Sequence, residues 1–382
     1  MDVEINDIRS SKDFRGITFS KYQKSKVKAE LLKSLDASKV ESACYWAAEL
    51  VCAGHMIDLW DCFIMYMSKD VHLGCPRLPV YLENRFNVFK EIITNGYVGQ
   101  ELRMRNDPRV RSLFSEIVGV LCYCKKKLAF TQVKIKTDDE FNMTTLASKL
   151  VASRITYAEH VFKKEDPKEL FIAANEFAYH IIDSKSAVQA CYWFEWIMEF
   201  EKRCKKNKEI ISCARRTFVA VQDKYQMEPI WLIWHIILSS TSDSKDLILQ
   251  RILNALLSIY CIRFTPGVKS RRRYIIYFAI SILTEHVNIA VPIINNERQI
   301  KNIVDKIDVV YQDVKKNEIR PATDYLSVHV KKSNLDKTIE RLNKINDISN
   351  PPILDKPNSR PTHDVSRESH DIPHKTKNII IS

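Results

Sequence analysis

Residues 43–46 read Ala-Cys-Tyr-Trp, and residues 190–193 read Ala-Cys-Tyr-Trp again. A Ser-Lys pair precedes each copy by a few residues. After Ala43, apolar side chains recur at positions i+3, i+4, i+7 and i+8, which is the spacing of one buried face of an α-helix. The first copy therefore predicts an amphipathic helix, and the second copy predicts a helix of the same kind.

A second pair of segments supports the same repeat. Residues 58–68 align with residues 229–239 and place Trp60 over Trp231. Helical segments that recur in the same order are typical of a duplicated supersecondary unit. We therefore predict an internal duplication. The expected core anchors of the two units are Trp46, Trp60, Trp193 and Trp231.

The composition favours an all-α protein. The chain has 382 residues but only 7 glycines, and hairpins, tight turns and glycine-rich phosphate loops all draw on glycine. A hydrophobic content of 45% and a charged content of 28% are ordinary for a globular chain. We predict an all-α fold of two related multi-helix units followed by a disordered C-terminal tail.

Breaks in helical periodicity and shifts in composition set the expected boundaries. The last 32 residues hold 5 of the 13 prolines among polar residues, which is typical of disorder. Within the second unit, the pattern predicts helices at residues 144–161 and 208–224, among others. The expected parts are a flexible arm at 1–20, helical unit 1 at 21–130, a linker or short strand at 131–143, helical unit 2 at 144–330 and a mostly disordered tail at 331–382.

No motif of a known catalytic site is present. The sequence contains no P-loop, no dinucleotide fingerprint and no zinc-protease or nucleophile-elbow motif. Zinc could use the pairs Cys52/His55 and His72/Cys75, but a helix about 22 Å long would hold the two pairs apart. We therefore expect no metal, no cofactor and no enzyme activity.

The chain also lacks an apolar run long enough to span a bilayer and has no secretory signal. Its 10 cysteines at helix-core spacing are best read as reduced and buried. We expect an intracellular protein, cytoplasmic or nuclear, that does not associate with a membrane.

The basic clusters are the strongest functional signal. The formal net charge of +12 suits an anionic partner such as nucleic acid. The run Arg271–Arg273 follows a Pro-Gly turn at an expected helix start, where cations oppose the helix dipole. Contact with phosphates would explain such charges better than local stabilisation does. The predicted nucleic-acid contacts are Arg271, Arg272, Arg273, Lys205, Lys206, Arg215 and Arg216.

About residues 40–80 resemble the helical C-terminal domain of the RarA/MgsA/WRNIP1 group of clamp-loader-like AAA+ proteins. The resemblance rests on a Trp helix that ends at a glycine and on a Ser-x-Asp turn that leads to a proline. The matching positions are Trp46, Gly54, Ser68, Asp70, Leu73 and Pro76. The resemblance implies a helical collar module that self-associates at replication forks, here without the ATPase part, so the chain could form a homo-oligomer.

The Lys-, Ile- and Asn-rich style of the chain also resembles uncharacterised proteins of large cytoplasmic DNA viruses. A viral origin would place the protein in the host cytoplasm or the virus factory.

Three functional hypotheses follow. The leading one is a non-enzymatic helical scaffold that contacts DNA, or a replication or transcription assembly, through its basic clusters. The alternative is a protein–protein interaction module with no nucleic-acid role. An enzyme would require a deep pocket where polar groups such as Glu49, Asp61 or His72 converge.

Overall fold

The computed structural model describes residues 3–135, 139–242, 246–294 and 296–320. Over these residues the regular structure is entirely helical, and the sole β-type pairing is an isolated bridge between Ile17 and Gln23. The all-α prediction is confirmed. The predicted tail at 331–382 lies outside the described residues.

The first half of the chain forms five consecutive α-helices that pack around an aromatic core. Trp60 is 2% exposed and contacts the rings of Phe63, Phe86, Phe89 and Phe114. The helices are α1 (Lys24–Asp36), α2 (Val40–Cys52), α3 (Met56–Tyr66), α4 (Leu78–Thr94) and α5 (Pro108–Tyr123), with short helical turns at Met67–Val71, His72–Gly74 and Glu101–Asn106.

Local chemistry explains the start of α5. Asp107 accepts a hydrogen bond from the backbone N–H of Arg109, so it satisfies one of the free donors at the helix start. Pro108 occupies the first helical position, where its missing N–H costs nothing. The start of this helix is therefore set by two adjacent residues of the sequence.

The described residues of the second half form seven more α-helices before the last one. Its core includes Trp193, Trp231 and Trp234, each 0% exposed. The helices are α6 (Met143–Ala147), α7 (Phe171–Ile182), α8 (Ala187–Lys206), α9 (Ile230–Ser239), α10 (Leu247–Cys261), α11 (Pro266–Arg271) and α12 (Arg273–Thr284), with turns at Asp139–Phe141, Lys168–Leu170 and Asp223–Tyr225.

Two predicted helices of this half are wrong. Residues 148–161 and 207–222 contain no helix, and α6 ends at Ala147. Buried side chains such as Val161 and Cys213 still pack inward from these irregular stretches, which is why their sequences carry an apolar signal. Residues 131–135 of the predicted linker or short strand form no strand.

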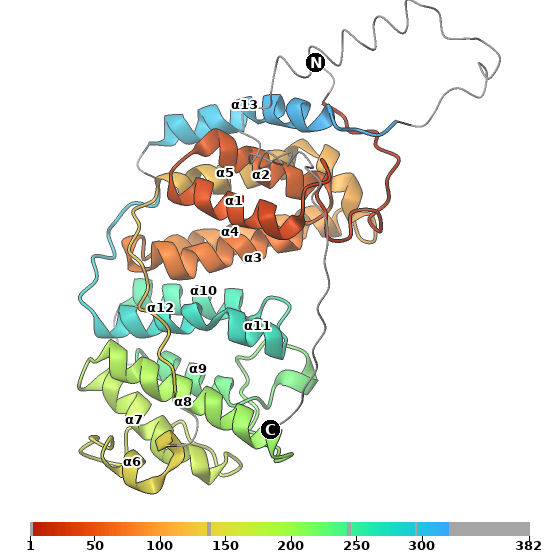
Figure 1. Cartoon of the computed structure of the whole chain (residues 1–382). Helices are drawn as coiled ribbons and strands as arrows, with labels where there is room; N and C mark the ends of the chain where they lie inside the picture. The colour runs from red at the N-terminus through yellow and green to blue at the C-terminus, as the bar shows by residue number, and fades with distance from the viewer. Residues whose placement is uncertain (1–2, 136–138, 243–245, 295, 321–382) are drawn as a thin grey trace, which may run out of the picture. The chain divides into compact units, whose positions relative to one another are not determined.

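The last helix, α13 (Glu297–Lys315), returns to the first half of the chain. It packs against α2 and α5 and lies beside them in Figure 1. Its Ile300 and Ile303 come so close to Gly119 of α5 that a Cβ at that glycine would lie about 3 Å from them. Residues 297–315 therefore belong with the first group of helices, which corrects the predicted unit of 144–330.

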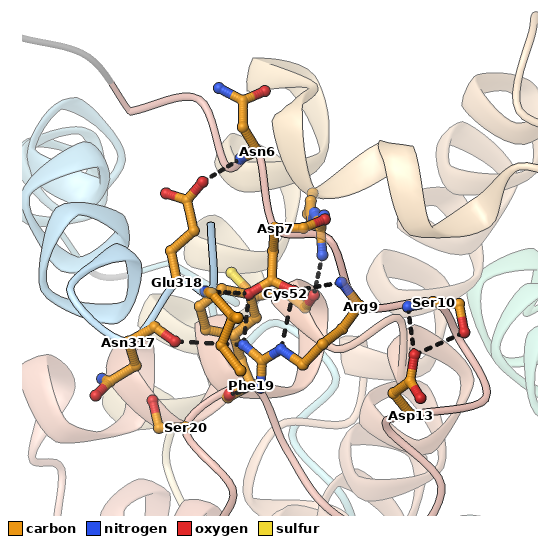
Figure 2. A network of polar contacts seen from close by, with 12 residues as sticks. Asn6, Asp7, Arg9, Ser10, Asp13, Phe19, Ser20, Cys52, Asn317 and Glu318 are labelled. Carbon is orange, nitrogen blue, oxygen red and sulfur yellow. Dashed lines mark hydrogen bonds and ion pairs between the residues drawn. The ribbon is translucent and has the colours of Figure 1, made fainter. Parts of the chain in front are cut away.

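The N-terminal segment is packed, which corrects the prediction of a flexible arm for its described residues 3–20. Ile5, Phe14 and Phe19 are at most 2% exposed. Figure 2 shows the polar network that joins this segment to the residues after α13. Asp7 accepts a hydrogen bond from the backbone N–H of Ile319 at 2.8 Å, and Ile8 donates its N–H to the carbonyl oxygen of Ile319.

Three of the four predicted tryptophan anchors are confirmed, and one is wrong. Trp60, Trp193 and Trp231 are buried, but Trp46 is half-exposed and its neighbour Tyr45 is buried in its place. The internal duplication stays a prediction. The two predicted units are not separate bodies, because α4 packs against α10 and α12 packs against the Met67–Val71 turn.

Candidate basic interface

Arg216, a predicted nucleic-acid contact, lies inside the protein. It is 4% exposed, and its guanidinium group forms a two-pronged ion pair with Asp166 at 2.6 and 2.7 Å. Burial alone would raise the pKa of Asp166, but hydrogen bonds from Arg216 and two backbone N–H groups together lower it. The structure therefore uses Arg216 to hold the irregular chain after α8 in place.

Arg272 is also internal, at 6% exposure. Its guanidinium group donates to the carbonyl oxygens of Ile259 and Tyr260 at the end of α10, at 3.2 and 3.1 Å, and to Asp61 of α3 at 2.9 Å. A cation at the C-terminal end of a helix stabilises the free carbonyl groups there. Arg272 was expected to oppose the dipole of the helix that it begins. Its charge instead lies at the C-terminal end of α10, where it is favourable.

Arg273 is partly buried and pairs with a buried acid. It donates to both carboxylate oxygens of Glu195 in α8, at 2.8 and 2.9 Å, and Tyr277 donates to the same carboxylate at 3.0 Å. Burial raises the pKa of Glu195 even though Arg273 and Tyr277 act to lower it. This pair connects α8 to α12.

The other four predicted contacts face solvent. Lys205, Lys206, Arg215 and Arg271 are all exposed. Lys205 forms an ion pair with Glu201 at 2.5 Å, and this pair raises the pKa of the Lys205 ammonium although burial acts to lower it. Within the described ranges, no acidic group pairs with Lys206, Arg215 or Arg271.

A cavity of about 520 Å³ brings two of the predicted residues together. Lys205 at the end of α8 and Arg273 at the start of α12 both line it, and residues 132–135 form another wall. Its lining has five basic and three acidic side chains, a formal charge of +2. The charged residues are Lys134, Lys202, Lys205, Lys269, Arg273, Glu195, Glu199 and Glu201.

Lys134, Lys202 and Lys269 line this cavity but are absent from the list of predicted contacts, and Lys269 is the most deeply buried of the three. It is 5% exposed and pairs with Glu201 at 2.7 Å and with Glu228 at 2.5 Å. Burying a charge is tolerated only when it is paired and hydrogen-bonded. Lys269 belongs to a basic run in the sequence, but nothing local shows that it turns inward.

The groups expected of an enzyme do not converge. Glu49 accepts hydrogen bonds from Thr18 and Ser20, and Asp61 binds Arg272. His72 packs on Phe278, and burial lowers the pKa of its imidazole to about 4. Among the described residues, no group of three or more His, Cys, Asp or Glu side chains is arranged to hold a metal ion.

Comparisons with known proteins add no relative. No protein-family model, no curated protein and no solved structure matches the chain. The resemblance of residues 40–80 to the clamp-loader-like proteins therefore stays a prediction. No helix in the described part of the chain is both long and apolar enough to cross a bilayer.

Proposed function

We propose that this chain is a non-enzymatic helical scaffold that contacts DNA, or a DNA-associated assembly, through exposed lysine and arginine side chains around the end of α8. One observation carries the proposal. Five of the seven residues from 202 to 208 are Lys or Arg, and all five are exposed. The neighbouring cavity also has more basic than acidic side chains. A protein that neutralises phosphates releases their counterions, so exposed lysine and arginine side chains supply affinity without sequence readout.

A competing explanation is local. Cations in the last turn of a helix interact favourably with its dipole, and Arg203, Lys205 and Lys206 lie in the last turn of α8. That explanation does not cover Arg215, which lies outside the helices, or Lys208, which follows the end of α8. The two explanations differ in one measurable respect, because only phosphate contact makes DNA affinity depend on these particular bases.

The experiment is a salt series with the full chain and single-stranded, duplex and forked DNA. The test variant replaces three basic residues with glutamine: Lys206→Gln, Lys208→Gln and Arg215→Gln. The control removes the same charge from exposed bases elsewhere: Lys26→Gln, Lys301→Gln and Lys306→Gln. We expect the slope of log affinity against log salt to flatten by about 2–3 in the test variant and much less in the control.

Two results would overturn the proposal. Binding that vanishes by about 0.15 M salt, where the Debye length is about 8 Å, would assign the charge to generic attraction. Equal slopes in the two variants would rule out the lysine and arginine side chains around the end of α8 as the DNA contacts.

A further inference from the structure

A second hollow region lies where the first group of helices meets α10 and α11. Two neighbouring cavities, of about 510 and 290 Å³, share Phe86 of α4 and the pair Ile262 and Arg263 that follows α10. Because they share these lining residues, the two cavities lie next to each other, and we treat them as one binding surface. We call it the Phe86 groove.

The floor of the Phe86 groove is apolar. Trp60, Phe86, Leu257 and Val268 line it and are each no more than 8% exposed. The indole N–H of Trp60 has no hydrogen-bond partner within the described chain. Such a floor suits side chains of Leu, Ile or Phe type, whose burial removes apolar surface from water.

The rim of the Phe86 groove is cationic. Lys90, Arg263 and Arg271 are exposed lining residues, and over the described ranges no acidic group pairs with any of them. The one acid in the lining, Asp61, is already bound to Arg272. The groove therefore presents three uncompensated positive charges around an apolar floor.

We propose that the Phe86 groove binds an acidic amphipathic segment of a partner protein. Apolar side chains of that segment would occupy the floor, and its carboxylates would pair with Lys90, Arg263 and Arg271. Helices that place one apolar face in a groove are a recurrent recognition mode, and complementary charge selects the partner. A nucleic-acid duplex fits less well, because its outer surface offers phosphates but no apolar anchors for this floor.

The test uses the full chain and three fluorescent probes at the same salt concentration. The first is a synthetic peptide of about 15 residues with Leu and Phe on one helical face and Glu on the other. The second has Lys in place of every Glu, and the third is a single-stranded oligonucleotide of matching negative charge. We expect the acidic peptide to bind at least tenfold more tightly than the basic one.

Two variants locate the binding. The triple variant Lys90→Gln, Arg263→Gln and Arg271→Gln removes the rim charges, and the matched control is again Lys26→Gln, Lys301→Gln and Lys306→Gln. The variant Ser258→Trp leaves the charge unchanged and fills the groove from an exposed lining position. We expect both groove variants to weaken acidic-peptide binding at least tenfold, the control to weaken it less than twofold, and thermal unfolding to show that all remain folded.

Three outcomes would overturn the inference. They are no acidic-peptide binding, equal losses in the groove and control variants, or an oligonucleotide that loses affinity in Ser258→Trp while the peptide does not. The last outcome would make the groove a nucleic-acid site. None of these results depends on whether the bases around the end of α8 bind DNA.

Discussion

The helices α2 and α8 share the sequence Ala-Cys-Tyr-Trp but pack differently. In both α2 and α8 the phrase begins at the fourth residue of the helix, and its cysteine is buried. In α2 the tyrosine, Tyr45, is buried and Trp46 is half-exposed, whereas in α8 Tyr192 is half-exposed and Trp193 is fully buried. The same local sequence thus forms the same element, and the neighbouring elements decide which ring becomes the core anchor.

The neighbours differ in kind. The helix α2 is covered by α1, α5, α13 and the N-terminal segment, so its buried acid, Glu49, meets hydroxyl and backbone donors from residues 18–20. The helix α8 packs on α7 and α12, and one of its two buried acids, Glu195, meets the guanidinium group of Arg273. Burial raises the pKa of both acids, but neutral donors bind the first and a positive charge pairs with the second.

The largest expected difference between the two helices is the loss of stability when the tryptophan of each is replaced by alanine. Trp193→Ala leaves a large cavity in the core of the second half and should lower the free energy of unfolding by about 3–5 kcal/mol. Trp46→Ala removes a half-exposed ring with edge contacts to Tyr22 and Tyr45, so about 1 kcal/mol is expected. Urea unfolding of both variants measures the difference. Equal losses would mean that the two phrases are equivalent anchors after all.

The next largest expected loss of stability concerns the N-terminal segment, which packs beside α2. Asp7 binds Arg9 and the backbone N–H of Ile319, so Asp7→Asn should cost about 1.5–3 kcal/mol as charged hydrogen bonds are lost. Amide exchange in α13 should also accelerate, because the end of that helix is released. The control is Asp13→Asn, an exposed acid that bonds only Ser10 among the described residues. Unchanged exchange in α13 would show that the segment does not hold it.

Sequence reasoning succeeded where structure is set locally. The all-helical class and three buried tryptophans follow from composition, spacing and hydrophobicity. It failed where the partner is remote in sequence. The partner of Arg272 at the end of α10 and the partner of Arg216 in Asp166 are set by tertiary packing. For the same reason, the pairing of α13 with α2 and α5 could not be read from its own apolar stripe.

The smallest expected effect concerns the pH dependence of the α2 site. Burial raises the pKa of Glu49 above its ordinary value, and the hydrogen bonds from Ser20 and Thr18 only partly offset this. A raised folded-state pKa means that the contribution of Glu49 to stability is complete below the unfolded pKa of about 4.3 and is lost as pH rises through the folded value. Glu49→Gln cannot ionise. We therefore expect the variant to gain stability relative to the wild type as the pH rises from 4 to 7.

Urea unfolding at a series of pH values measures that difference, whatever the absolute cost of placing an amide at position 49. The matched control is Glu41→Gln, which removes an exposed acid of the same helix. A Glu49→Gln difference that stays flat would mean that Glu49 ionises as easily in the folded chain as in the unfolded one. The contrast between the two helices would then reduce to which aromatic ring is buried.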